Sequence, residues 1–159
     1  LVLLPIVVGA AIYGPSAGAI LGGVFGIVII AGYLSGNVDF LWMANPVATA
    51  LVCLIKGCGA GFVSGCVYRL FAKSKFSSGK IIGAYASAIT CPVVNTGIFL
   101  LAMFTIFKQQ LVEIAGNTST IYFAFVVLAG VNFLVELAVN VVLAPVIVGV
   151  MNAIKGNKR

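Results

Sequence analysis

The sequence has little of what an enzyme needs. It contains no histidine and only three acidic residues, Asp39, Glu113 and Glu136, in 159 positions. It has no phosphate-binding loop of the Walker type, and its carboxylates do not lie near one another along the chain. Since most catalytic constellations require such groups, we expect no catalytic residues and no enzymatic activity.

The four cysteines, Cys53, Cys58, Cys66 and Cys91, do not indicate a metal site. All of them lie inside apolar stretches, and their spacings are not those of paired metal ligands. We interpret them as buried, reduced thiols, and we predict neither a metal site nor a cofactor.

The basic residues do not predict nucleic-acid binding. Nine lysines and arginines give a formal net charge of +6. They are scattered or lie at the ends of apolar stretches, and they do not interleave with aromatic residues on one face. We therefore expect no nucleic-acid partner, and the distribution indicates membrane topology instead.

Hydrophobic side chains are what the chain has in abundance. They make up 62% of its residues against 8% charged ones, and the mean hydropathy is +1.24. These values lie far outside the range of water-soluble domains. A spanning helix needs about 20 mainly apolar residues, and most of the chain divides into such stretches. The sequence therefore predicts an all-α membrane protein, with one compact domain in the lipid bilayer over residues 1–159.

Five apolar helices are predicted. The first segment, Leu1 to Tyr13, is too short to cross a bilayer unaided. Longer helices are expected at about 16–34, 46–71, 81–107 and 120–154. Asn45 and Pro46 are typical of an N-cap followed by proline at the first helical position. Pro92 removes one backbone hydrogen bond and predicts a kink, and residues 108–119 are expected to form a polar loop.

The basic residues set the predicted topology. Positive charge accumulates in cytoplasmic loops, and it gathers here between Arg69 and Lys80 and again from Lys155 to Arg159. Two helices separate these segments, which agrees with a cytoplasmic position for both, the C-terminus included. Counting back places Leu1 at the external face. This start suggests that one earlier helix is missing and that the parent architecture has six helices.

Glycines repeat every four residues on two predicted helices. One set is Gly18, Gly22 and Gly26, and the other is Gly57, Gly61 and Gly65. This spacing puts each set on one helix face, where another backbone can approach closely. Tight packing is the simpler interpretation. The functional alternative is that Gly18, Gly22 and Gly26 belong to a surface that docks a partner subunit.

Lys56 and Glu136 are the two charges expected at mid-helix depth. A charge at the bilayer centre costs about 2.5–3.5 kcal/mol on insertion scales, so such residues usually have a role. Two interpretations carry nearly equal weight. The residues pair with each other and hold two helices in register, or they contact a ligand.

Asn132, Glu136 and Asn140 recur every four residues and form one polar stripe along the last helix. Because lipid would penalise this stripe, we expect it to face the bundle interior or a water-filled cavity open to the outside. Asn95 and Thr96, just beyond Pro92, are candidates for further polar groups at similar depth. Hydrogen bonding between helices is the alternative for these residues.

Trp42 and Asn45 complete the candidate binding residues. Trp42 and Phe40 precede the helix that Asn45 opens, where they could cap a pocket reached from outside. Anchoring at the membrane interface is the alternative for the aromatic residues.

Several short motifs follow one another along the chain. They are the run from Pro5 to Gly23, which contains Tyr13-Gly14-Pro15, then Asn45-Pro46, the run Val94-Asn95-Thr96-Gly97-Ile98-Phe99, and the polar last helix. In this order and spacing they resemble the substrate-binding S components of energy-coupling factor (ECF) vitamin transporters. The resemblance covers nearly the whole chain.

The resemblance implies a six-helix subunit of the bacterial cell membrane that binds a vitamin from outside. It implies assembly with one transmembrane coupling subunit and two ATPase subunits, so that ATP is hydrolysed outside this chain. In the family, the first helix carries an alanine-rich docking motif. By this comparison the present chain begins at the second helix.

Among vitamins, pantothenate-type members look closest, particularly around Gly14-Pro15 and Asn95-Thr96. Lys56 could meet one carboxylate while asparagines satisfy the hydroxyls and amide of a small acid. Folate would need more positive charge and riboflavin more aromatic surface. Thiamine stays open because Glu136 could pair with a cation, and pyridoxine is a further alternative.

Two other classes of protein are alternatives. The first is a self-sufficient secondary transporter or channel, in which the polar residues line a route across the membrane. Inverted repeats and discontinuous helices would favour it, and we find no convincing inverted repeat in the sequence. The second is a purely structural membrane subunit, which would bind no ligand tightly.

Overall fold

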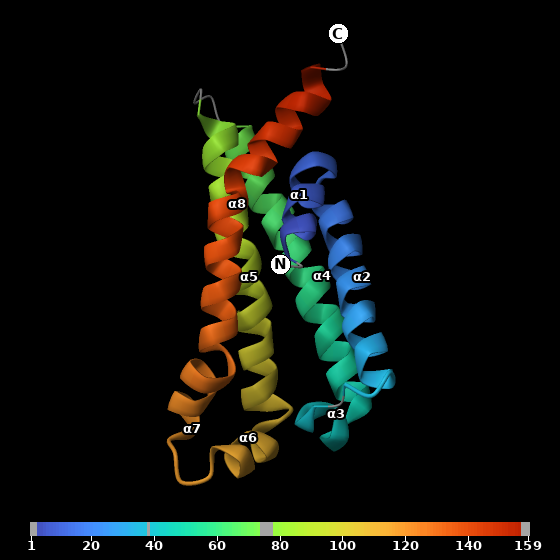
Figure 1. The fold of residues 1–159 in the computed structure, drawn as a ribbon, viewed down its shortest axis with the longest axis vertical. Helices are drawn as coiled ribbons and strands as arrows, with labels where there is room; N and C mark the ends of the chain where they lie inside the picture. The colour runs from blue at the N-terminus through green and yellow to red at the C-terminus, as the bar shows by residue number, and fades with distance from the viewer. Residues whose placement is uncertain (1–2, 38, 74–77, 157–159) are drawn as a thin grey trace.

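The computed structural model describes residues 3–37, 39–73 and 78–156, and within them the chain forms helices and no strand. The elements are α1 (Leu3–Tyr13), α2 (Pro15–Leu34), α3 (Phe40–Ala44), α4 (Pro46–Ala72), α5 (Gly79–Thr105), α6 (Lys108–Ala115), α7 (Thr120–Tyr122), the π-helical segment η1 (Phe123–Leu128) and α8 (Gly130–Gly156). Figure 1 shows them as one elongated bundle.

The prediction of an all-α membrane protein is confirmed. In the described part of the chain, four helical spans are long and apolar enough to cross a membrane. They are Pro15–Leu34, Pro46–Ala72, Gly79–Thr105 and Thr120–Val150. The remaining predicted helix, α1, is shorter than these four, and it packs against α2, α4, α5 and α8.

The ends of the bundle differ in charge. The end of α4, the start of α5 and the C-terminal end of α8 lie at one end, whereas α3 and α6 lie at the other (Figure 1). Arg69 and Lys73 stand at the end of α4, and Lys80 stands at the start of α5. The two basic segments therefore share one end, as the topology requires, and the cytoplasmic position of this end stays a prediction. Lys75, Lys158 and Arg159 lie outside the described residues.

Helix α1 is a core element. Its first described turn lies about half-way along the bundle (Figure 1), and Leu3, Ile6 and Val7 are buried. The prediction that the chain starts at the external face concerns Leu1, which lies outside the described residues. What α1 supplies is apolar packing at the end of the bundle that carries the C-terminus.

The glycine repeat of α2 is covered by α4. Gly18, Gly22 and Gly26 are all buried. A Cβ atom added to Gly18 would overlap the carbonyl of Gly61, and one added to Gly22 would overlap the carbonyl of Gly57. The prediction that Gly18, Gly22 and Gly26 form a docking surface is therefore wrong. The two glycine repeats face each other and let two backbones of the same chain touch.

The predicted start of α4 is confirmed in detail. Asn45 Oδ1 accepts a hydrogen bond of 3.0 Å from the backbone N–H of Ala48, and Pro46 occupies the first turn. The segment just before it, with Phe40 and Trp42, forms the short helix α3, which Asp39 caps by accepting a hydrogen bond from Trp42 N–H at 2.9 Å.

The last predicted helix is not continuous. Between α7 and α8 the chain passes through η1, where Ala129 N–H donates to the carbonyl of Ala124 at 3.1 Å, five residues back. Apolar periodicity does not distinguish this wider turn from an α-helix. The polar loop expected at 108–119 contains α6, which ends at Gly116 with a positive φ of 54°.

Two apolar cores enclose a more polar layer. One core joins α1, α4, α5 and α8 through residues such as Ala60, Cys91 and Ala144. The other joins α3, α4, α5, α6 and η1 through residues such as Val52 and Met103. On α4, α5 and α8 the segments between these cores carry the polar residues of the candidate site. Not every cysteine is buried as predicted, because Cys66 is exposed on α4.

Candidate functional site

Polar side chains from three helices meet at one cavity between the two cores. The cavity has a volume of about 90 Å³. Its walls are Lys56 from α4, Asn95, Thr96 and Phe99 from α5, Leu128 and Ala129 from the end of η1, and Asn132 from α8. We call it the inner cavity. Four of the predicted binding residues, Lys56, Asn95, Thr96 and Asn132, are therefore brought together from distant parts of the sequence.

Lys56 and Glu136 are close enough to attract each other but do not form an ion pair in the described structure. The ammonium Nζ of Lys56 lies 5.6 Å from the ring centroid of Phe99, which is a cation–π distance. Of the two interpretations that the sequence left open, direct pairing is not what the structure contains. Contact with a ligand remains a prediction.

Among the described residues, three buried oxygen atoms of Asn95 and the α8 stripe have no hydrogen-bond partner. They are Asn95 Oδ1, Glu136 Oε2 and Asn140 Oδ1. The side chain of Asn95 interacts with the Glu136 carboxylate, which turns its amide nitrogen towards Glu136 and leaves its oxygen free. A buried acceptor without a donor costs about 1–3 kcal/mol. The site therefore has an excess of acceptors, which suits a molecule that brings N–H or O–H donors.

The predicted stripe on α8 runs from the cavity into the core. Asn132 is exposed and lines the inner cavity, Glu136 is half-buried, and Asn140 is only 2% exposed. All three lie on the uninterrupted part of α8, so their four-residue spacing does place them on one face. Asn132 is nearest the α6 end of the bundle.

A second cavity of about 180 Å³ lies between the inner cavity and α3. We call it the outer cavity. It is lined by Tyr33, Asp39, Phe40, Leu41, Thr49, Val52, Cys53, Lys56, Phe99, Ala102, Met103 and Phe107. Trp42 and Asn45 are not in the walls of either cavity. Trp42 stacks on Tyr33 at a centroid distance of 5.0 Å, and the amide oxygen of exposed Asn45 is used by the cap of α4.

Hydrogen bonds hold α3 across the end of the outer cavity. The hydroxyl of Tyr33 donates to Asp39 Oδ2 at 2.7 Å, while Asp39 Oδ1 caps α3. Thr49, buried at the start of α4, donates from Oγ1 to the carbonyl of Leu41 at 2.8 Å. Asp39 therefore ties the end of α2 to α3, and Thr49 ties α3 to α4.

Asp39→Ala should loosen this end of the bundle without unfolding it. The change removes a helix cap, which is worth about 0.5–2 kcal/mol, and the acceptor of the Tyr33 hydroxyl. We expect a lower midpoint of thermal unfolding for the purified protein in detergent. Tyr33→Phe, which removes only one hydrogen bond, is expected to have the smaller effect. Equal stability of Asp39→Ala and the wild type would contradict the cap.

Reasoning from the sequence missed several residues of the site. Tyr33, Asp39 and Phe99 line the outer cavity, and Phe99 also lines the inner one. An aromatic residue in an apolar helix looks like any core residue. The spacing of Phe99, four residues after Asn95 on the same helix face, is the signal that could have indicated it.

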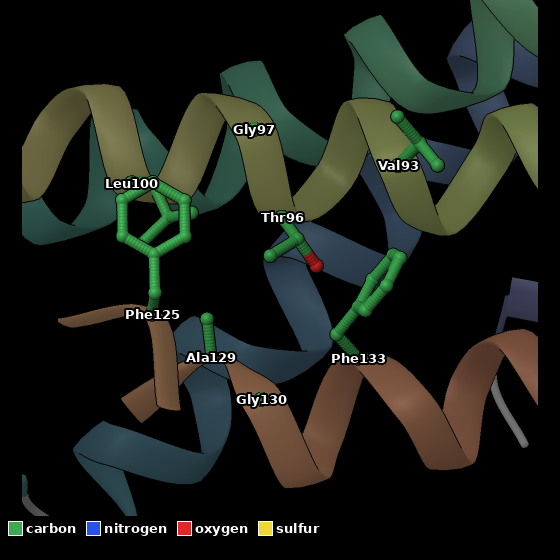
Figure 2. A pocket seen from close by; sticks show the side chains of 8 residues that line it. All are labelled: Val93, Thr96, Gly97, Leu100, Phe125, Ala129, Gly130 and Phe133. Atoms are coloured by element: carbon green, nitrogen blue, oxygen red, sulfur yellow. The ribbon is translucent and has the colours of Figure 1, made fainter. Parts of the chain in front are cut away.

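A third cavity of about 220 Å³ lies between α5 and the η1–α8 segment (Figure 2). Figure 2 shows Phe125 and Phe133 reaching towards α5 on either side of Thr96. Thr96 is the single polar side chain among its eight lining residues, and it also borders the inner cavity. Because Lys56 and Asn95 do not line it, the third cavity lacks the polar chemistry of the site.

The site is equipped for binding. It presents an ammonium group and amide groups around the inner cavity, with aromatic and apolar walls beside them. Glu136 lines neither cavity but interacts with Asn95, which does. No protein-family model, curated protein or solved structure matches this chain. The polar groups that converge on the inner cavity are therefore the strongest indication of what the protein does.

Proposed function

We propose that this chain is the vitamin-binding S component of an ECF-type transporter and that its ligand is a small acid of the pantothenate type. The observation that supports this most is the set of buried, unpaired acceptors beside a lone ammonium group, between two apolar cores. Polar groups at this depth are costly in a membrane bundle, and a specific ligand is a good reason to keep them.

Pantothenate suits the chemistry of these groups. Its single carboxylate would meet Lys56 in a charge-assisted hydrogen bond. Its two hydroxyls and its amide N–H are donors, which Asn95 Oδ1 and Glu136 Oε2 lack. Folate would bring a second carboxylate to a site with one lysine, and riboflavin would need a wider aromatic surface. Thiamine would rely on Glu136 alone, and pyridoxine would leave Lys56 without an anion.

The proposal includes partner subunits that supply energy. The sequence contains no phosphate-binding loop, so concentrating a scarce vitamin would require ATPases elsewhere in the complex. One transmembrane coupling subunit and two ATPase subunits are the partners proposed, in the bacterial plasma membrane with the C-terminus in the cytoplasm. Their docking surface would lie away from the α2–α4 contact, because this chain itself buries that contact.

Binding and transport should separate experimentally. The isolated chain is expected to bind radiolabelled pantothenate in detergent, and mass spectrometry of gently purified protein should detect the vitamin. Uptake into proteoliposomes should require the coupling subunit, the ATPases and ATP. Failure to bind any of the five vitamins would contradict the proposal. Binding of another vitamin would keep the S-component assignment and correct the ligand.

A self-sufficient secondary transporter is the second candidate, and one observation favours it. Helices interrupted near a polar site are typical of secondary transporters, and η1 interrupts the last span next to the inner cavity, which Leu128 and Ala129 line. The same proteoliposomes distinguish the two. Uptake by this chain alone, driven by an ion gradient without ATPases, would favour the secondary transporter.

A further inference from the structure

Two residues stand between the inner and the outer cavity. Of all the lining residues, Lys56 and Phe99 are the ones that border both. They come from facing positions on α4 and α5, and the Lys56 ammonium rests 5.6 Å from the Phe99 ring centroid. The boundary between the two cavities is therefore a cation–π contact between two side chains.

The sizes of the cavities argue that this boundary changes when a ligand binds. The inner cavity holds about 90 Å³, while ligand pockets generally measure about 300–1,000 Å³. At about 30 Å³ for each water molecule in the liquid, this is room for a few waters. The outer cavity adds about 180 Å³ immediately beyond Lys56 and Phe99. A vitamin-sized ligand needs more room than the inner cavity offers. Separating the two side chains would join it to the outer cavity and give about 270 Å³, close to the lower limit of that range.

We propose that the outer cavity is a second compartment of the ligand site, and that Lys56, held at the junction by Phe99, selects anionic ligands. An anionic ligand draws the ammonium group off the ring and into a charge-assisted hydrogen bond, which joins the compartments. A neutral ligand must break the same cation–π contact but gains no charge-assisted hydrogen bond. This inference rests on the proposed function for the ligand, but the junction itself is a property of this chain.

The test compares pantothenate with panthenol, its neutral alcohol analogue. Calorimetry gives the affinities. The chain has one tryptophan, Trp42, whose stacking partner Tyr33 lines the outer cavity, so its fluorescence should change when a ligand fills that compartment. In the wild type, panthenol should bind at least about tenfold more weakly, because a hydrogen bond to a charged group is lost.

Phe99→Leu keeps an apolar side chain but removes the ring. Since the cation–π contact no longer has to be broken, pantothenate should bind more tightly by about two- to thirtyfold, the range of such a contact. Phe104→Leu is the matched control, since Phe104 lies on α5 but in the walls of neither cavity. Weaker pantothenate binding by Phe99→Leu, or a change no larger than in the control, would overturn the proposal.

Absence of pantothenate binding by the wild type would count against the proposed ligand. A second measurement tests the Lys56–Phe99 junction even in that case. The lysines are reductively methylated with ¹³C, and Lys56→Arg identifies the Lys56 signal. Its methyl resonance should be shifted upfield by the ring in the wild type and not in Phe99→Leu. Adding millimolar valerate, a simple monocarboxylate, should move it towards its position in Phe99→Leu. An unshifted resonance, or no response to valerate, would overturn the junction.

Discussion

Gly22→Leu is expected to prevent the bundle from assembling. The Gly22 backbone lies directly against the carbonyl of Gly57, and even a Cβ atom would overlap it. Overpacking a well-packed core typically costs about 1–3 kcal/mol and occasionally more. The neighbour here is backbone and cannot rotate away, so the loss should be at the upper end, at about 3 kcal/mol or above. Little monomeric protein should survive size-exclusion chromatography in detergent.

Gly32→Leu is the matched control for this prediction. Gly32 lies on the same helix, and nothing would lie within 4 Å of an added Cβ atom. The control should therefore be purified in the same yield as the wild type and unfold at a similar temperature. If Gly22→Leu also behaved like the wild type, and lost only its assembly with partner subunits, the glycine face would be a docking surface after all.

The glycine repeats show how far a pattern can be interpreted. Four-residue spacing correctly predicted a smooth helix face and close backbone approach. It did not say which surface approaches. Gly18 and Gly22 meet Gly61 and Gly57, so the partner of one repeat is the other repeat in the same chain. Only the path of the chain through α3, which returns α4 beside α2, decides this.

Local signals located helix starts better than helix continuity. Asn45 and Pro46 specify the start of α4 through one side-chain hydrogen bond and one fixed φ, and both are encoded by adjacent residues. The wider turn of η1 lies where the segment packs against α5 and α6, which are distant in the sequence or separated from it by a turn. An apolar run such as Phe123–Leu128 is compatible with either helix type, so the sequence predicted one continuous helix.

The candidate site was predictable where it is polar. Lys56, Asn95 and Glu136 were conspicuous because lipid penalises them, and the structure does place them together. The cavity walls were not predictable, because nothing in the sequence distinguishes Phe99 from an aromatic residue in the core. The direct Lys56–Glu136 pair, equally plausible from the sequence, is not made because Lys56 turns towards Phe99.

Glu136→Gln is expected to separate ligand binding from stability. The substitution keeps the shape of the side chain and removes the charge. A hydrogen bond to a charged group is worth about 1.5–3 kcal/mol, so pantothenate affinity should fall by about 10- to 150-fold. The fold should suffer little, because Glu136 Oε2 has no hydrogen-bond partner among the described residues, and a glutamine can still accept from the Asn95 amide.

The measurement is a binding titration and a thermal unfolding curve on the same sample. Glu113→Gln is the matched control, since Glu113 lies exposed on α6 and loses the same charge. It should change neither property. An unfolding temperature at or above that of the wild type together with weakened binding would mark Glu136 as a residue kept for the ligand at the expense of stability. A fall in both would mean that Glu136 holds the helices together, and unchanged binding would remove it from the site.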